Sequence, residues 1–218
     1  MPTTEPLSFL VVGTAGVEVA PFVEPDPYGV LHSAQPWAPR VCRCGQLHAP
    51  CDPAVVALLV GPPQGHVHLD PLTCGLAVFP EGRPWAAPEF SHVSVAARDF
   101  NRSAAEVVRH VVSGLAEPSL GCFEVQDLVL TLSPPRPLRF ACASSEHGLA
   151  VAVAELVAEA SWLSAETRAV TLAVRGSYLT LQEISDACLV LQQRVPDASV
   201  LLTSPDSPGA AMVSILGA

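Results

Sequence analysis

Between residues 90 and 218 the spacing of apolar side chains alternates between that of helices and that of strands. Residues 103–115, 147–163 and 181–195 carry apolar side chains every three or four positions, as one face of a helix requires. Short apolar runs between them predict strands at 91–97, 128–133, 138–144, 169–174, 199–204 and 210–217. This alternation restricts the chain to a layered α/β (α+β) fold, in which helices pack on a mixed sheet.

The stretch from Tyr178 to Ser204 predicts a capped helix followed by a buried strand. Thr180 and Glu183 have the spacing of a capping box, in which each side chain bonds a backbone amide at the helix start. Ser103 and Glu106 have the same spacing. The buried face of the 181–195 helix is predicted to comprise Ile184, Ala187, Cys188, Leu191 and Val195.

Residues 1–89 have a different character, because proline-rich connections separate short apolar runs and helical periodicity is absent. Strands are expected there at 8–13, 54–61 and 74–79. We therefore expect two parts, a mostly-β, Pro/Gly-rich region at 1–89 and an α/β domain at 90–218. In the second part, the order of helix and strand at 103–138 recurs at 147–181, which indicates either a duplicated βαβ unit or the ordinary rhythm of an α/β layer.

The charge of the chain argues against nucleic acid as a partner. The formal net charge is -10, and all 11 basic residues are arginines that form no cluster, whereas phosphate backbones and anionic membranes attract clustered cations. Charged residues make up only 15% of the chain, against about 25% in average proteins. The relatively apolar surface that results favours a protein partner or self-association into an oligomer.

Cysteine usage and the lack of targeting signals indicate a protein of the reducing cytoplasm rather than a secreted one. Seven cysteines are an odd number, and four of them stand apart in apolar settings. No basic stretch precedes the first apolar run, so no signal peptide is expected, and no run of 18 apolar residues predicts a membrane span. The arginine-only bias is typical of a GC-rich, bacterial genome.

The last 80 residues resemble the C-terminal domain of the FtsZ/tubulin superfamily, from Leu138 to Ala218. The matching segments are, in order, LRFACASSEHG, AVAELVAEASWL, AVTLAVRG, LTLQEISDA, VPDASVLLTS, PDSPGA and AMVSILGA. The resemblance implies a mixed-sheet α/β domain from a family of filament-forming proteins. It also implies a cytoskeletal or cell-division-associated role.

The GTP-binding signature of that family is missing from this sequence. The family holds phosphates with the backbone amides of a loop of the type GGGTG(T/S)G, and no such run occurs here. The segment FLVVGTAG has only Gly13 and Gly16, and it favours the turn of a β-hairpin. Asp99 matches in type one acidic residue of the family's hydrolysis loop, but the second is missing, and an ordinary loop aspartate is the alternative. The resemblance therefore implies a relative without GTPase activity.

A cluster of soft ligands makes a structural zinc the candidate cofactor. CRCGQLHAPC places Cys42, Cys44, His48 and Cys51 within one short loop, and thiolates with an imidazole suit tetrahedral zinc. Free thiols or a disulfide are the alternatives, because zinc ligands normally arrive in two separated pairs.

Two further groups of residues have the types needed for chemistry. His66, His68 and Asp70 would share one face of an extended strand. Two interpretations of that face are left open, a metal site and a face exposed to solvent. Cys142 precedes His147 closely enough for a thiol–imidazole pair at a helix start, although packing of the thiol is the alternative.

Taken together, these patterns favour a non-enzymatic interaction or assembly protein, for which no catalytic residue can be named. No nucleophile elbow is present, and the absence of lysine excludes Schiff-base chemistry. The alternative is a small-molecule- or metal-binding protein, or a hydrolase, with a site between the two halves. That alternative requires convergence of five side chains, namely His66, His68, Cys74, Asp99 and His147.

Overall fold

The computed structural model describes residues 8–13, 38–43, 56–61, 74–82, 90–116, 125–167, 169–196, 199–203 and 209–218. Internal contacts divide the chain into two compact units. The first unit takes the described residues up to Val112 together with 132–137, and the second takes those at 113–131 and 138–218. Each unit is described by itself below.

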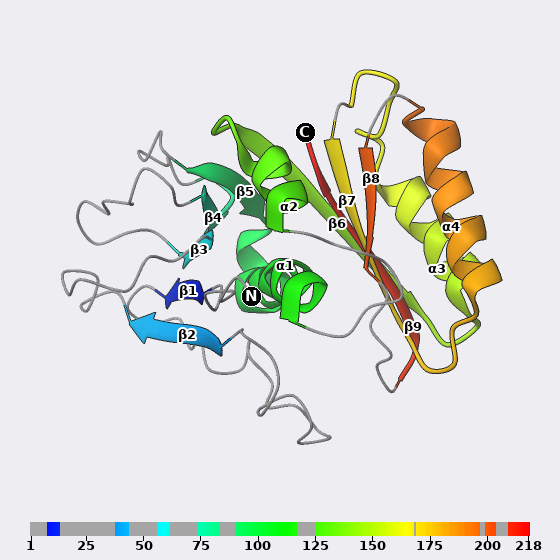
Figure 1. The fold of residues 1–218 in the computed structure, drawn as a ribbon, viewed down its shortest axis with the longest axis horizontal. Coiled ribbons are helices and arrows are strands. Elements are labelled where there is room, and N and C mark those ends of the chain that lie inside the picture. The colour runs from blue at the N-terminus through cyan, green and yellow to red at the C-terminus, as the bar shows by residue number, and fades with distance from the viewer. Residues whose placement is uncertain are drawn as a thin grey trace, which may run out of the picture. The chain divides into compact units, whose positions relative to one another are not determined.

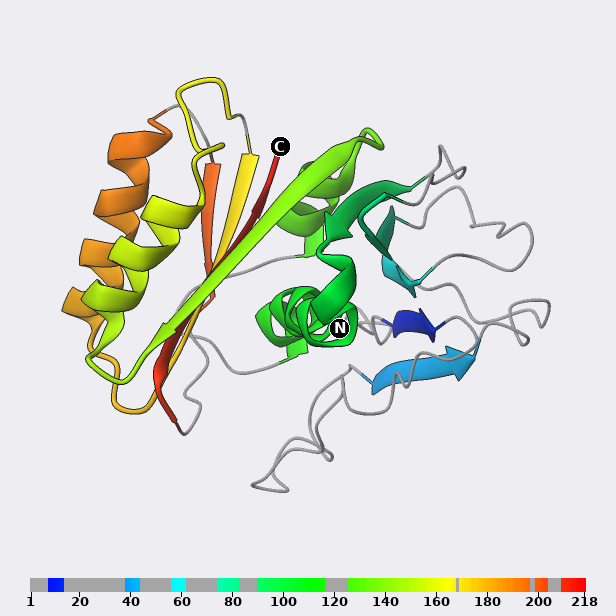
Figure 2. The same cartoon turned by 180° about the vertical axis from the view of Figure 1, so that it is seen from behind.

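The first unit contains a five-stranded sheet in which every pairing is parallel (Figure 1, Figure 2). Its strand order is β2-β1-β3-β4-β5. The strands are β1 (Ser8–Gly13), β2 (Ala38–Arg43), β3 (Val56–Val60), β4 (Cys74–Pro80) and β5 (Ser91–Val95). Three consecutive residues of β3, Leu58 to Val60, and three of β4, Leu76 to Val78, are buried. Continuous apolar runs of this kind are typical of parallel strands that are covered on both faces.

The parallel pairing corrects the interpretation of FLVVGTAG as one arm of a hairpin. β1 pairs with β2 and with β3, in parallel in both cases. A two-residue turn joins only antiparallel strands, since parallel neighbours need a long crossover. The hairpin prediction for Gly13 and Gly16 is therefore wrong.

Helix α1 (Phe100–Ala116) follows β5 through a short 3₁₀ helix at Ala97–Asp99. Its start corrects a detail of the sequence analysis, because Ser103 lies inside the helix and not at its N-cap. The helical spacing is confirmed by the apolar side chains that α1 buries among the described residues, namely Ala104, Val107, Val108 and Val111.

Helix α2 (Val125–Leu132) replaces the strand that was expected at 128–133. Short apolar runs fit a buried strand and a buried helix equally well by composition. The burial pattern shows the reason for the helix: Leu128 and Leu132 are buried four positions apart, whereas Leu130 between them is 69% exposed. The first copy of the proposed repeat at 103–138 consequently has a helix where the second copy has a strand.

The second unit contains a four-stranded mixed sheet of order β6-β9-β7-β8. The strands are β6 (Pro137–Ser145), β7 (Ala169–Arg175), β8 (Ser199–Thr203) and β9 (Ala211–Gly217). β9 is antiparallel to both β6 and β7, and β7 is parallel to β8. The mixed α/β layer predicted for the C-terminal half is confirmed.

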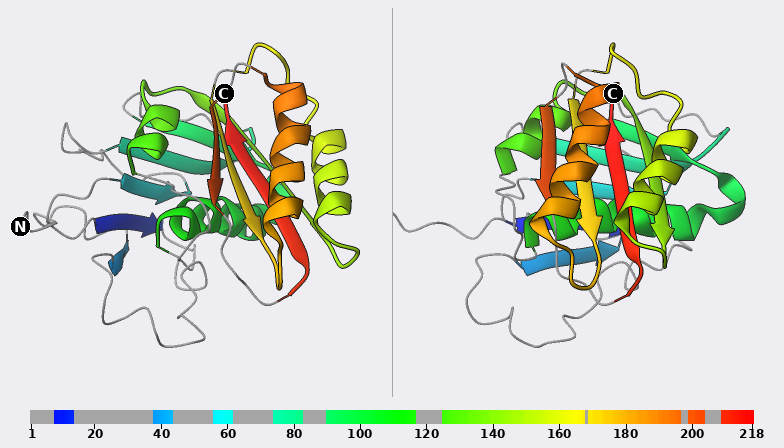
Figure 3. Two further views of the ribbon diagram at one scale, coloured as in Figure 1. Left: turned by 45° about the vertical axis from the view of Figure 1, so that its right-hand side comes forward. Right: turned by 90° about the vertical axis from the view of Figure 1, so that its right-hand side faces the viewer.

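Two helices cover one face of this sheet, α3 (Leu149–Glu159) and α4 (Leu181–Arg194), and they lie side by side (Figure 1, Figure 3). The predicted face of α4 is confirmed, since Ile184, Ala187 and Leu191 are buried and Cys188 is half-buried. These side chains share one core with Leu156 of α3 and with strands β7 and β9. No helix in the described part of the chain is both long and apolar enough to cross a membrane.

Replacing Ser91 with alanine is expected to lower the free energy of unfolding by about 1–3 kcal/mol, because it removes a buried polar bridge in the first unit. The Ser91 hydroxyl donates to the carbonyl of Leu132 at 2.6 Å and accepts the backbone N–H of Arg136 at 3.0 Å. Urea unfolding followed by circular dichroism measures the change. Ser94→Ala on the same strand is the matched control, because Ser94 is exposed. Equal stability of the two variants would contradict this role for Ser91.

Candidate functional site

The turn that joins β7 to α4 is fixed against the start of β9 by two contacts. Gly176 is buried in the turn, and a Cβ atom there would lie 3.2 Å from the Cα of Ala211 and 3.3 Å from the side chain of Leu179. The backbone N–H of Gly209 donates to the Ser177 hydroxyl oxygen at 3.0 Å. This turn and the residues directly before β9 therefore form one surface, which we call the β7–α4 tip. It comprises Ser177, Tyr178, Leu181, Gly209 and Ala210.

Tyr178 is the most unusual residue of the β7–α4 tip. Its φ angle is 60°, and it is the only residue other than glycine with positive φ in the described part of the chain. An L-residue in this region costs roughly 1–2 kcal/mol, and the cost is rarely accepted for bulky side chains. Burial does not offset it, because Tyr178 is 94% exposed. Strain of this kind concentrates at functional sites.

Leu181 extends the apolar surface of the β7–α4 tip from the first turn of α4. It is 69% exposed, and the capping box predicted from the sequence is confirmed and holds the first turn in place. The N–H of Glu183 donates to the Thr180 hydroxyl at 3.2 Å, and the N–H of Thr180 donates to a Glu183 carboxylate oxygen at 2.8 Å. These two bonds occupy amides that the helix itself leaves unpaired.

The capping box makes the stability of α4 depend on pH. Hydrogen bonds from the backbone and the hydroxyl of Thr180 lower the pKa of Glu183 below its ordinary value of 4.5. Because the folded pKa is depressed, this contribution is fully present above pH 4.5 and is lost as the pH falls through the folded pKa. Glu183→Gln is therefore expected to flatten the acid side of the stability–pH profile, measured by urea unfolding. The exposed Glu166→Gln is the control and should leave the profile unchanged; a profile that Glu183→Gln does not alter would contradict the role of the cap.

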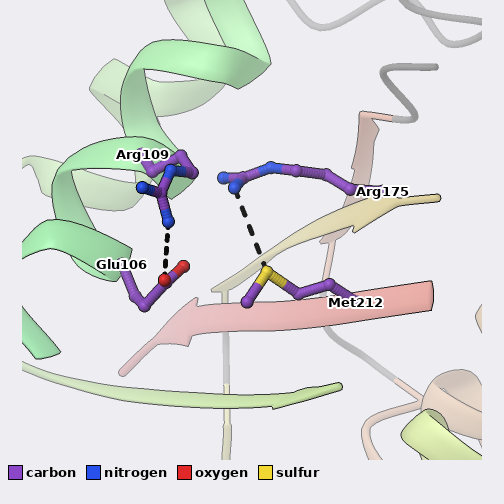
Figure 4. Close-up of polar contacts among 4 residues, drawn as sticks. All are labelled: Glu106, Arg109, Arg175 and Met212. Carbon is purple, nitrogen blue, oxygen red and sulfur yellow. Dashed lines mark hydrogen bonds and ion pairs between the residues drawn. The ribbon is translucent and has the colours of Figure 1, made fainter. Parts of the chain in front are cut away.

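A buried cation lies on the β7 side of the β7–α4 tip. Arg175, the last residue of β7, is only 7% exposed, and its Nη1 lies 4.0 Å from the Met212 sulfur on β9 (Figure 4). Figure 4 also shows the ion pair within α1, where Nη1 of Arg109 donates to the Glu106 carboxylate at 2.6 Å. The bond between Arg175 and Met212 joins the end of β7 to the beginning of β9.

The residues predicted to bind zinc fall largely outside the described residues. Cys42 lies in β2, and Cys44, His48 and Cys51 are outside the described ranges. His66, His68 and Asp70 are outside them as well. Within the described part of the chain, no three His, Cys, Asp or Glu side chains come together as metal ligands. The zinc site therefore stays a prediction.

The remaining candidate side chains are divided between the two units, with Cys74 and Asp99 in the first and His147 in the second. Asp99 in the first unit is 58% exposed and pairs with Arg98 at 3.2 Å. In the second unit His147 is exposed, and its backbone N–H donates to the Ser145 hydroxyl oxygen at 3.1 Å. Burial raises the pKa of the Cys74 thiol and of the Cys188 thiol, which disfavours the reactive thiolate.

The order of the parallel strands places two glycines at a topological switch point of the first unit. β2 and β3 lie on opposite sides of β1, and open α/β sheets bind ligands at the carboxyl ends of strands where the order reverses. Gly13 ends β1, and Gly61 follows β3 with a φ of 89° and donates its N–H to the Val78 carbonyl at 2.7 Å. Gly13 was weighed as part of a phosphate loop and interpreted as a hairpin turn, whereas its grouping with Gly61 was not predicted. The signal for this pair was two apolar runs of buried type, FLVVG and ALLVG, each ending in glycine.

No family model matches the sequence, and no curated protein matches it. Solved structures do. The chain is similar to a mutant FtsZ from M. jannaschii, with a TM-score of 0.65 and 11% identity over 97% of this chain and 90% of that chain.

Two further structures share the fold over a smaller part of their length. An empty FtsZ dimer from M. jannaschii matches with a TM-score of 0.51 and 14% identity, over 75% of this chain and 54% of that one. A GDP-bound monomer of CetZ1 from Haloferax volcanii matches with a TM-score of 0.50 and 11% identity, over 75% and 64%. The chain thus spans less than two thirds of the length of both.

At these identities the similarity concerns the fold. It extends well beyond residues 138–218, since the first of these structures covers nearly the whole chain, including the parallel sheet of the first unit. This chain has an FtsZ-like fold.

Proposed function

We propose that this chain is a non-enzymatic assembly protein that associates with copies of itself through the β7–α4 tip. The observation that carries the proposal is Tyr178, a bulky residue held at positive φ and 94% exposed. Tyrosine is among the residues that contribute most to protein interfaces. Leu181, 69% exposed, adds apolar area on the same surface.

The similar structures and the composition support self-association. One of the similar structures is described as an FtsZ dimer. The low charged fraction of 15% suits a surface that is covered in an assembly. A cytoskeletal or cell-division-associated role is part of this proposal and rests on the FtsZ-like fold. The bacterial cytoplasm as its location rests on the arginine-only bias and the cysteine usage.

The proposal includes the absence of GTP hydrolysis. The sequence contains no glycine-rich run of the GGGTG(T/S)G type. P-loop enzymes are a different class, which contacts phosphates with a lysine, and the lack of any lysine argues against that class as well. These two features support an assembly protein that does not turn over nucleotide.

Substitution of Leu181 tests the surface. Sedimentation velocity of the purified chain over a range of concentrations should show species larger than the monomer, and Leu181→Ser should shift them toward the monomer. Leu189→Ser is the matched control on the same helix, because Leu189 is 52% exposed but is not part of the tip. A monomer at every concentration, or equal loss of association in both variants, would refute the proposal.

A small ligand bound at the carboxyl ends of β1 and β3 is the second candidate function. The topological switch point with Gly13 and Gly61 favours it, because glycine lets the backbone approach a ligand closely. Calorimetric titration with GTP and with GDP tests it. Heat of binding with a defined stoichiometry would support this function, and its absence for both nucleotides would remove nucleotide as the ligand.

A further inference from the structure

A groove of about 380 Å³ lies between β6 and α3 in the second unit. Its lining residues are Cys142, Ala143, Glu155, Ala158 and Glu159. The alanine methyl groups and the half-buried thiol supply apolar surface, and the two exposed glutamates lie four positions apart on α3. This volume is at the lower end of the range for ligand pockets, and it suits one or two side chains of a partner rather than a large cofactor.

In the part of the chain that the structure describes, no cation pairs with the two glutamates of the groove. Among the described residues, the carboxylates of Glu155 and Glu159 form no hydrogen bond or ion pair. The stretch from Glu146 to Glu166 contains four glutamates and no arginine or lysine. Like charges four positions apart on a helix repel each other, so a cation at this position would relieve the repulsion.

We propose that this groove binds an arginine side chain from a basic segment of a second protein. A guanidinium pairs with carboxylates through two parallel hydrogen bonds, and Glu155 and Glu159 would supply the oxygens. The methylene stem of an arginine packs along apolar surface while its head stays charged, and Ala143 and Ala158 offer that surface. The groove thus complements both the charge and the apolar stem of this side chain.

The charge of the chain points to a different protein as the source of the arginine. A second copy would bring another net charge of -10 to a groove that is itself negative, and like-charged surfaces disfavour association. The groove is also separate in sequence from the β7–α4 tip, so this inference does not depend on self-association through Tyr178. Failure of one proposal leaves the other standing.

A short peptide that carries arginine between leucines is the probe, and its binding is measured by fluorescence anisotropy at physiological salt. The wild-type chain should bind it, and the double variant Glu155→Gln/Glu159→Gln should bind roughly tenfold more weakly, since exposed ion pairs contribute modestly. Glu146→Gln/Glu166→Gln is the matched control, because it removes the same charge from exposed positions outside the groove. This control should change the affinity by less than about twofold, because screening weakens distant charges.

A second readout locates the peptide. Bound peptide should slow alkylation of Cys142, which lines the groove, and leave alkylation of Cys188 on α4 unchanged. Three results would overturn the inference: no binding by the wild-type chain, equal binding of a peptide with citrulline in place of arginine, or equal weakening by both double variants.

Discussion

Replacing Leu191 with alanine is expected to lower the free energy of unfolding by about 2–5 kcal/mol, because the truncation leaves a cavity in the core of the second unit. Leu191 is fully buried on the inner face of α4. It shares a core with Leu156 of α3 and with Ile215 of β9. Leucine and alanine have similar helix propensities, so the loss reports packing rather than helix formation. Urea unfolding followed by circular dichroism measures it.

Leu189→Ala is the matched control for the core substitution. Leu189 lies two positions earlier on the same helix and is 52% exposed, so its truncation should cost less than about 1 kcal/mol. A large difference between the two leucines would establish which face of α4 packs on the sheet. Equal costs would contradict the orientation of α4 described above.

Replacing Tyr178 with glycine or asparagine is expected to stabilise the monomer slightly while it abolishes most of the self-association. Removing the strain of the left-handed conformation stabilises the folded monomer by roughly 1–2 kcal/mol. The greater freedom of glycine in the unfolded chain offsets about 0.5–1 kcal/mol of that gain. Asparagine tolerates positive φ and carries a smaller entropic cost. No packing is lost, because the side chain is 94% exposed.

The same substitutions should weaken association roughly thirtyfold, the effect of losing one interface tyrosine worth about 2 kcal/mol. Sedimentation equilibrium measures association, and urea unfolding at low concentration measures the monomer. Tyr178→Phe keeps the ring and the strain, and it is expected to retain most of the association. A variant that loses stability together with association would contradict the assignment, because it would give Tyr178 a structural role.

Local features of the sequence predicted the second unit well. The capping box of Thr180 and Glu183 depends only on residues three positions apart, and the buried face of α4 depends only on helical spacing. The mixed-sheet layer was expected from the FtsZ-like resemblance, and similarity to solved structures confirms that fold. A sequence pattern can directly encode interactions between residues that are close together in the sequence.

Long-range pairing and backbone strain were not predictable in the same way. The parallel neighbours of β1 lie far away in sequence, so nothing in FLVVG itself distinguishes them from the arms of a hairpin. Most of the run at 128–133 lies in helix α2, in which Leu128 and Leu132 are both buried. Their burial depends on tertiary packing, which the run itself does not reveal. The positive φ of Tyr178 was not predictable, because tyrosine gives no local signal for it.

The candidate sites were likewise only partly predictable from the sequence. The pairing of Cys142 with His147 stays a prediction, and in the fold Cys142 lines a groove together with Glu155 and Glu159. Those glutamates belong to α3, and helical spacing predicts that both lie on its solvent-exposed face. The spacing does not indicate which strand lies beside that face. Only the return of α3 along β6 brings the thiol and the two carboxylates to one place.

Sedimentation velocity of the wild-type chain, with and without GTP and with phosphate release followed in parallel, distinguishes a non-enzymatic assembly protein from a GTP-driven one. We expect the same concentration-dependent association in both conditions and no release of phosphate above background. A chain that stays monomeric in both conditions, or one that assembles only with GTP and releases phosphate as it does so, would contradict a non-enzymatic assembly protein.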